Sequence, residues 1–108
     1  MSLNIDPPVA TFPASGATAI HQFINLTKDR LAFKIKSSNN DHYRVKPVYG
    51  FIEPEAKTAV ELIRLNGPPK EDKFVVLWAV VPTGETDPQA PFNAGAEGGE
   101  VMLPVKAE

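Results

Sequence analysis

The sequence predicts an all-β fold, a two-layer antiparallel sandwich of about seven strands. Apolar and polar residues alternate with a period of two in several short segments, and turn-forming residues separate these segments about every ten residues. Eleven prolines and seven glycines in 108 residues indicate many turns, which fits short strands better than long helices. With 43% apolar and 22% charged residues, the composition is that of one globular domain, here residues 1–108.

Two strands are expected in the N-terminal quarter. Residues 3–6 begin the first strand, two prolines interrupt it, and residues 9–12 resume pairing at the edge of a sheet. Residues 17–26 form the second strand, in which His21 and Phe23 share one face. The alternation in this strand leaves open which face is buried.

The clearest alternation lies in residues 31–36, where three apolar residues alternate with one alanine and two lysines. This pattern predicts a strand with one face toward water. A polar loop is expected at residues 37–41. Residues 43–46 then form a short strand with positive charge on its outward face, and Pro47 ends its regular pairing.

Three more strands are expected in the C-terminal half. Residues 58–63 alternate, and residues 74–81 are apolar on both faces, which favours a central strand covered on both sides over a short buried helix. Residues 82–99 are expected to form a long loop, and residues 101–105 a last strand that Pro104 confines to an edge. The apolar sides of these alternations predict a core that contains Leu31, Phe33, Ile35, Val45, Val60, Leu62, Trp78 and Leu103.

Charge and composition exclude several classes of function. A net charge of −2 provides no general attraction for nucleic acid or an anionic membrane, so we expect neither as a partner. The chain has no cysteine, which fits a reducing compartment, and its first residues do not resemble an export signal. No apolar stretch approaches the roughly 18 residues of a membrane span. We therefore expect a cytoplasmic protein without direct membrane insertion.

Four sequence segments, in this order and spacing, resemble the major sperm protein (MSP) domain family, especially its VAMP-associated protein branch. They are a strand ending at Asn25, then Phe33-Lys34-Ile35-Lys36-Ser37-Ser38, then Tyr43-Arg44-Val45-Lys46-Pro47, then Gly50-Phe51-Ile52-Glu53-Pro54. The resemblance implies a seven-stranded immunoglobulin-like sandwich. The short chain is most similar to the small sperm-specific MSP-domain proteins of nematodes.

The resemblance also implies a peptide-binding face. VAMP-associated proteins bind acidic tracts with two phenylalanines, the FFAT motif, and the matching positions here are Lys34, Ile35, Lys36, Ser37, Ser38, Lys73 and Val75. Val75 stands where those binders have a methionine, and the two serines replace threonines, so we expect weaker binding. The alternative is that the lysines only keep an exposed strand face solvated.

His21 falls where relatives carry an aliphatic residue. We expect a buried imidazole there to be hydrogen-bonded to a backbone group or a hydroxyl, with no functional role.

Catalysis and metal binding have little support in the sequence. Asp41 and His42 lie beside Ser37 and Ser38, which leaves a small hydrolase as an alternative, although neighbours in sequence commonly point apart. The two histidines lack the spacing of a zinc site, and we expect no cofactor.

The leading hypothesis is a non-enzymatic protein-interaction module of the nematode sperm MSP type, accessory to the MSP cytoskeleton. The alternative is an adaptor for acidic FFAT-type peptides. We expect a monomer or weak homodimer, because Pro7, Pro8 and Pro104 interrupt the expected edge strands.

Overall fold

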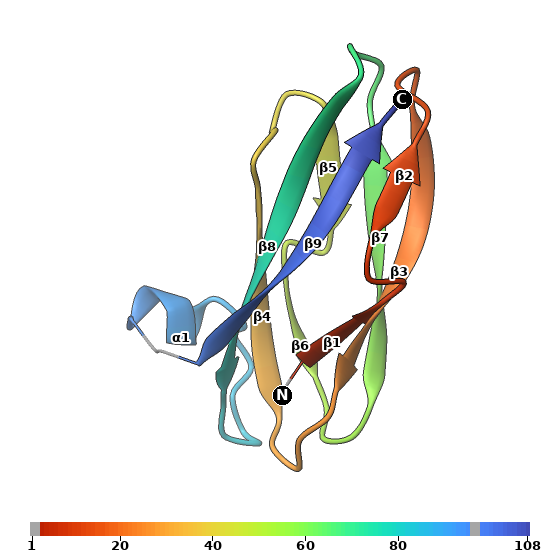
Figure 1. Ribbon diagram of the computed structural model, residues 1–108. Helices are drawn as coiled ribbons and strands as arrows, with labels where there is room; N and C mark the ends of the chain where they lie inside the picture. The colour runs from red at the N-terminus through yellow and green to blue at the C-terminus, as the bar shows by residue number, and fades with distance from the viewer. Residues whose placement is uncertain (1–2, 96–97) are drawn as a thin grey trace.

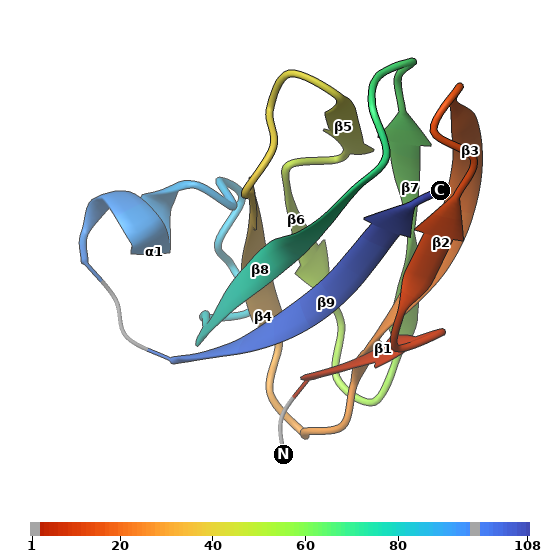
Figure 2. The same ribbon diagram turned by 45° about the horizontal axis from the view of Figure 1, so that its top comes forward.

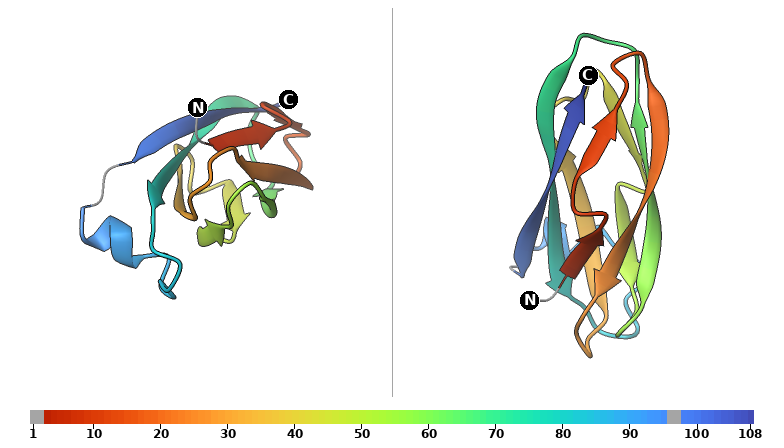
Figure 3. Two further views of the ribbon diagram at one scale, coloured as in Figure 1. Left: turned by 90° about the horizontal axis from the view of Figure 1, so that it is seen from below. Right: turned by 45° about the vertical axis from the view of Figure 1, so that its right-hand side comes forward.

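The computed structural model describes residues 3–95 and 98–108, and these residues form two β-sheets packed face to face (Figure 1). One sheet has the strand order β1-β3-β7-β5 and the other β2-β9-β8-β4-β6. The elements are β1 Leu3–Asp6, β2 Ala10–Phe12, β3 Ala17–Asn25, β4 Leu31–Ser37, β5 Tyr43–Lys46, β6 Tyr49–Ile52, β7 Lys57–Arg64, β8 Lys70–Val80, α1 Ala90–Asn93 and β9 Gly99–Ala107. The two layers are seen along their edges in Figure 3.

The all-β sandwich is confirmed, but the described residues form nine strands where seven were expected. The expected first strand is two strands: β1 pairs with β3, whereas β2 pairs in parallel with β9 in the other sheet. Pro7 and Pro8 lie between them and cannot donate ladder hydrogen bonds, so the chain changes sheets there. The second addition is β6, which the sequence analysis did not identify as a strand.

Register along β4 separates the interior from the surface. Phe33 lies opposite Trp78, and Ile35 opposite Val76, with these side chains directed into the sandwich. Six of the eight expected core residues are buried, and Val45 and Trp78 are partly buried against the same core. The alternation in residues 31–36 therefore predicted the inward face correctly.

The expectation that β8 is a central strand is confirmed, because it lies between β9 and β4. Its expected coverage on both faces holds for only part of the strand. On the outer face Ala79 is 1% exposed, whereas Val75 and Leu77 are half-buried. The outer face of β8 is therefore a surface with apolar character.

The expectation that Pro104 marks an edge strand is wrong, since β9 lies between β2 and β8. The main-chain N–H and C=O of Lys73, opposite Pro104, both bond to Ser38 on the β4 side. In an antiparallel ladder this pair exchanges no hydrogen bonds, so the missing N–H of Pro104 faces away from β8. β2 begins to pair with β9 only at Val105, and the ladder loses nothing at the proline.

The expected loop at residues 82–99 contains the short helix α1, and residues 96–97 lie outside the described part of the chain. The segment lies on the side of the molecule that carries β4 and β6 (Figure 2). Phe92 there contacts Tyr49, with ring centroids 6.1 Å apart. The Arg30 guanidinium donates to the Glu85 carbonyl and lies 3.8 Å from the centre of the Phe51 ring. The N-terminal end of β4 is thus covered on its outer face.

The face of β3 that the alternation left open is resolved by His21 and Phe23, which are both buried. The His21 imidazole Nδ1 lies 2.9 Å from the Pro7 carbonyl oxygen. The expectation of a buried, backbone-bonded histidine is confirmed.

Asn25 ties three segments together at one end of the sandwich. Its side-chain amide donates to the carbonyls of Asp29, Ile52 and Glu53 at 2.7, 3.1 and 3.1 Å. Its carbonyl oxygen accepts from the Thr27 N–H and hydroxyl at 2.9 and 2.7 Å. Asn25 is 1% exposed, and its bond to the Ile52 carbonyl is buried, while the other bonds are partly buried.

We predict that Asn25→Ala lowers the free energy of unfolding by about 3 kcal/mol, because one buried and several partly buried polar groups lose their partner together. The exposed Asn4→Ala is the control and should change it by less than about 0.5 kcal/mol. Urea unfolding measures both, and equal stabilities of the two variants would contradict the role assigned to Asn25.

Candidate functional site

The candidate site is the outer face of β4 and β8. Lys34 and Lys36 project from β4, and Lys73 and Val75 from β8, where Lys36 lies opposite Val75 and Lys34 opposite Leu77. Because alternate residues of a strand share a face, the register places three lysines on one side of the sheet. We call this surface the lysine face. Lys36 and Lys73 are exposed, and Lys34 is half-buried with its Nζ 5.5 Å from the centre of the Tyr49 ring.

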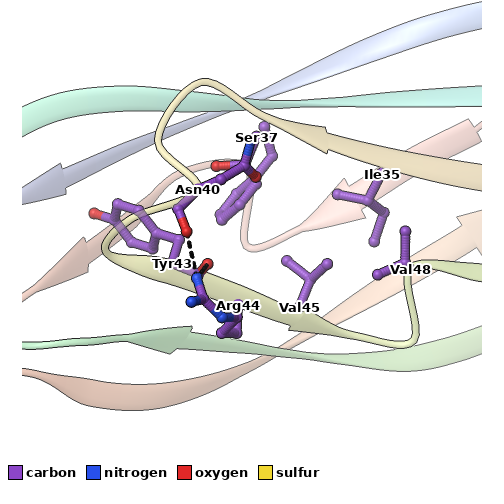
Figure 4. A pocket seen from close by; sticks show the side chains of 8 residues that line it. Ile35, Ser37, Asn40, Tyr43, Arg44, Val45 and Val48 are labelled. Carbon is purple, nitrogen blue, oxygen red and sulfur yellow. Dashed lines mark hydrogen bonds between the residues drawn. The ribbon is translucent and has the colours of Figure 1, made fainter.

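Two of the seven expected binding residues point the other way. Ile35 is 5% exposed and, with Ser37, borders a cavity of about 300 Å³ between β4 and β5 (Figure 4). The cavity is lined by Ile35, Ser37, Asn40, Tyr43, Arg44, Val45, Val48 and Phe74. The structure therefore divides the expected set between two surfaces on opposite sides of β4.

Ser38 holds the end of β4 against β8. Its hydroxyl donates to Asp72 Oδ1 at 3.0 Å and accepts from the Lys73 main-chain N–H at 3.0 Å, and its own N–H donates to the Lys73 carbonyl. These contacts fix the position of Lys73 relative to β4. Ser38 thus supports the lysine face through the backbone.

Asp72 is a site residue that the sequence analysis missed. Its side chain is 4% exposed, and its second carboxylate oxygen accepts from the Asn39 amide at 3.0 Å. Lys70 Nζ lies 3.6 Å from Oδ1. The carboxylate is thus held by two neutral donors, with one ammonium group beside it. In the sequence, Asp72 is only a carboxylate directly before Lys73, and this position does not predict its contacts with Ser38 and Asn39.

The third strand of the face is β9. Its outward residues Met102 and Glu100 lie opposite Val75 and Leu77, and Met102 is 52% exposed. The face consequently has lysines on β4 and at one end of β8, an apolar strip of Val75, Leu77 and Met102, and the acidic Glu100 opposite Leu77. The antiparallel pairing of β8 with β9 brings these groups together. Alternation within a single strand does not predict this pairing.

The contacts of His42 do not form the nucleophile and base that a hydrolase requires. The ring Nδ1 lies 3.3 Å from Asn39 Oδ1, while the Ser37 hydroxyl accepts from the Asn39 N–H. The Ser38 hydroxyl donates its hydrogen bond to Asp72. The hydrolase alternative therefore has no support in the hydroxyl and imidazole positions.

Within residues 3–95 and 98–108, no group of three or more acidic or histidine side chains is arranged to hold a metal ion. No helix in this described part is long and apolar enough to cross a membrane.

The sandwich is of the class shared by MSP and PapD-like domains. It superposes on the ASH/PapD-like domain of human CEP192 with a TM-score of 0.66 at 11% identity, covering 99% of this chain and 85% of that one. At this identity the likeness shows the fold alone. The model of the MSP (Major sperm protein) domain family matches residues 2–101, and the chain belongs to that family.

Its relatives include small nematode sperm proteins. Sperm-specific class P protein 32 of Caenorhabditis elegans is 55% identical over 104 residues, which are 96% of this chain and 97% of the relative. Sperm-specific class P protein 34 of the same organism is 52% identical over 101 residues, or 94% of each chain. The solved structure of WR4, a C. elegans MSP family member, matches with a TM-score of 0.97 at 50% identity over 100% of both chains. The resemblance to nematode sperm MSP-domain proteins is confirmed.

We predict that Asp72→Ala lowers the free energy of unfolding by about 2 kcal/mol, because it leaves the Asn39 amide and the Ser38 hydroxyl without their acceptor. Glu71→Ala removes the adjacent, exposed carboxylate and should have an effect below about 0.5 kcal/mol. Thermal or urea unfolding of the pair measures the difference. Similar losses in both would show that Asp72 is not a structural link.

Proposed function

We propose that the chain is a non-enzymatic protein-interaction module of the nematode sperm MSP type, acting in the cytoplasm as a single MSP domain over residues 1–108. The observation that carries the proposal is the lysine face, where Lys34, Lys36 and Lys73 project from neighbouring strands of one sheet. The sperm-specific names of the relatives support the cellular setting.

The partner that suits this face is an acidic, phenylalanine-containing segment of the FFAT type. Three ammonium groups on one side of a sheet attract a polyanionic ligand over several ångströms and speed its association. A protein with a net charge of −2 lacks such attraction elsewhere on average, so the face is a local feature. The local charge gives selectivity for acidic segments.

Affinity should be modest because the apolar contact at Val75 is small. Compared with a methionine, a valine offers less area to a phenyl ring, which corresponds to about 1 kcal/mol or several-fold in affinity. Glu100 on the neighbouring strand also opposes acidic groups that extend over β9. The acidic residues of the ligand therefore belong over β4 and the end of β8.

We predict that an acidic peptide with phenylalanine binds the protein and that Lys34→Asp and Lys73→Asp each weaken binding at least about tenfold at low salt. Binding should also weaken as salt rises, since the Debye length is about 8 Å at physiological ionic strength. Calorimetric titration gives the affinities.

The matched control is Lys57→Asp, which makes the same charge change on β7 in the opposite sheet. It should retain affinity within about twofold, because its charge is remote and screened. Equal affinity in all four proteins, or no binding at low salt, would falsify the lysine face as a binding site.

An accessory role in the MSP cytoskeleton is a second candidate, supported by membership of the MSP family. Such a role requires contact with MSP filaments and does not require self-assembly of this chain. The four edge strands of the described residues, β1, β2, β5 and β6, have four residues or fewer. Short edges limit pairing with other chains, which favours a monomer or weak dimer.

For assembly, we expect light scattering at micromolar concentration to give the mass of a monomer or weak dimer. Co-sedimentation with filaments of a nematode MSP should then carry the protein into the pellet only when filaments are present. Stable filaments of this chain alone would contradict weak assembly, and its absence from the filament pellet would contradict the accessory role.

A further inference from the structure

Met102 lies at the centre of the apolar strip on the outer face of β8 and β9. Val101, Leu103 and Val105 alternate with it and face the core, so Met102 must point outward. Its side chain is 52% exposed, among the most exposed large apolar side chains in the described residues. An exposed methionine opposite Val75 has no evident role in the stability of the fold.

The hydrogen-bond pattern brings Met102 close to Val75. The N–H and C=O of Lys73 both face β4, and those of Val75, two residues later, face the same way. The Val75–Met102 pair therefore exchanges no hydrogen bonds across the β8–β9 ladder. In such pairs the Cα atoms are about 4.5 Å apart, and the side chains are in closer contact than in hydrogen-bonded pairs.

We propose that Met102 supplies the apolar anchor of the lysine face, so that an aromatic side chain of an acidic protein segment binds over Val75 and Met102. The inference rests on the proposed function and adds where the ligand's aromatic residue sits. Thioether sulfur makes favourable contacts with aromatic rings at about 5 Å, and a flexible side chain adapts to the ring. The valine at position 75 thus leaves room for the methionine of the adjacent strand to take up the contact.

The charges around the strip set the orientation of the ligand. Lys36 lies on the β4 side of Val75, and Lys73 precedes it on β8, whereas Glu100 lies two residues from Met102 on β9. Glu71 and Lys106 face each other farther along the same two strands. A segment with its aromatic residue over β8 and β9 and its acidic residues over β4 satisfies the lysines and avoids Glu100. A ligand in the reverse orientation places its carboxylates against Glu100.

The first test is a pair of synthetic acidic peptides that differ only by phenylalanine or alanine at one position. The wild-type protein should prefer the phenylalanine peptide by about fivefold, and Met102→Ser should reduce this preference to nearly one. Ile20→Ser removes an equally exposed apolar side chain from the opposite sheet and should keep the full preference. Both variants should retain the salt dependence that the lysines confer.

A second readout does not depend on affinity. The sequence has two methionines, Met1 and Met102, so a protein labelled at the methionine methyl carbons gives two signals. The Met102 signal, assigned with Met102→Leu, should move on titration with the phenylalanine peptide because of the aromatic ring above it. The alanine peptide should leave it nearly unchanged.

An unchanged preference in Met102→Ser together with an unmoved Met102 methyl signal would overturn the inference, while lysine-dependent binding would still uphold the proposed function. If the wild-type protein binds neither peptide, both the inference and the proposed function are overturned. A Met102→Ser variant that changes only the oligomeric state, with peptide binding intact, would assign the strip to a second copy of the chain and also overturn the inference.

Discussion

The register between β4 and β8 is the constraint on which both the core and the surface depend. It places Phe33 and Ile35 inside the sandwich and Lys34 and Lys36 outside. A shift of one residue would exchange the two sets, burying ammonium groups without partners and exposing the aromatic core. The same pairing that stabilises the fold therefore creates the basic face. Ser38 secures this register at the end of β4, where it bonds to Asp72 and to the backbone of Lys73.

Much of the fold follows from alternation within single strands. Residues 31–36 and 58–63 alternate, and their inward apolar residues are buried in the core, because burial selects one face of each strand. Which strands pair with each other was harder to predict from the sequence. Pro104 suggested an edge, yet a proline is tolerated inside the sheet where its missing N–H faces the gap before β2 begins. The division of residues 3–12 between two sheets was not predictable for a similar reason. Prolines show where a strand stops pairing, but they do not show which strand the chain pairs with afterwards.

The site shows the same limit. The lysines were predicted as outward residues, but Ile35 and Ser37, which are close to them in sequence, border a cavity on the other side of β4. Met102 and Asp72 were missed because their importance comes from cross-strand neighbours, Val75 for one and Ser38 for the other. The family resemblance identifies the expected peptide-binding positions. The β8–β9 register shows which side chain of this chain, Met102, lies beside Val75.

We propose that the outer face of β4, β8 and β9 is the recognition surface, with acidic groups over the lysines and an aromatic group over Met102. The most direct measurement is amide chemical-shift mapping of the wild-type protein with an acidic phenylalanine peptide at low salt. We expect the shifts to concentrate in residues 34–38, 73–77 and 100–104. Shifts concentrated on β3 and β7, or around the cavity between β4 and β5, would contradict it.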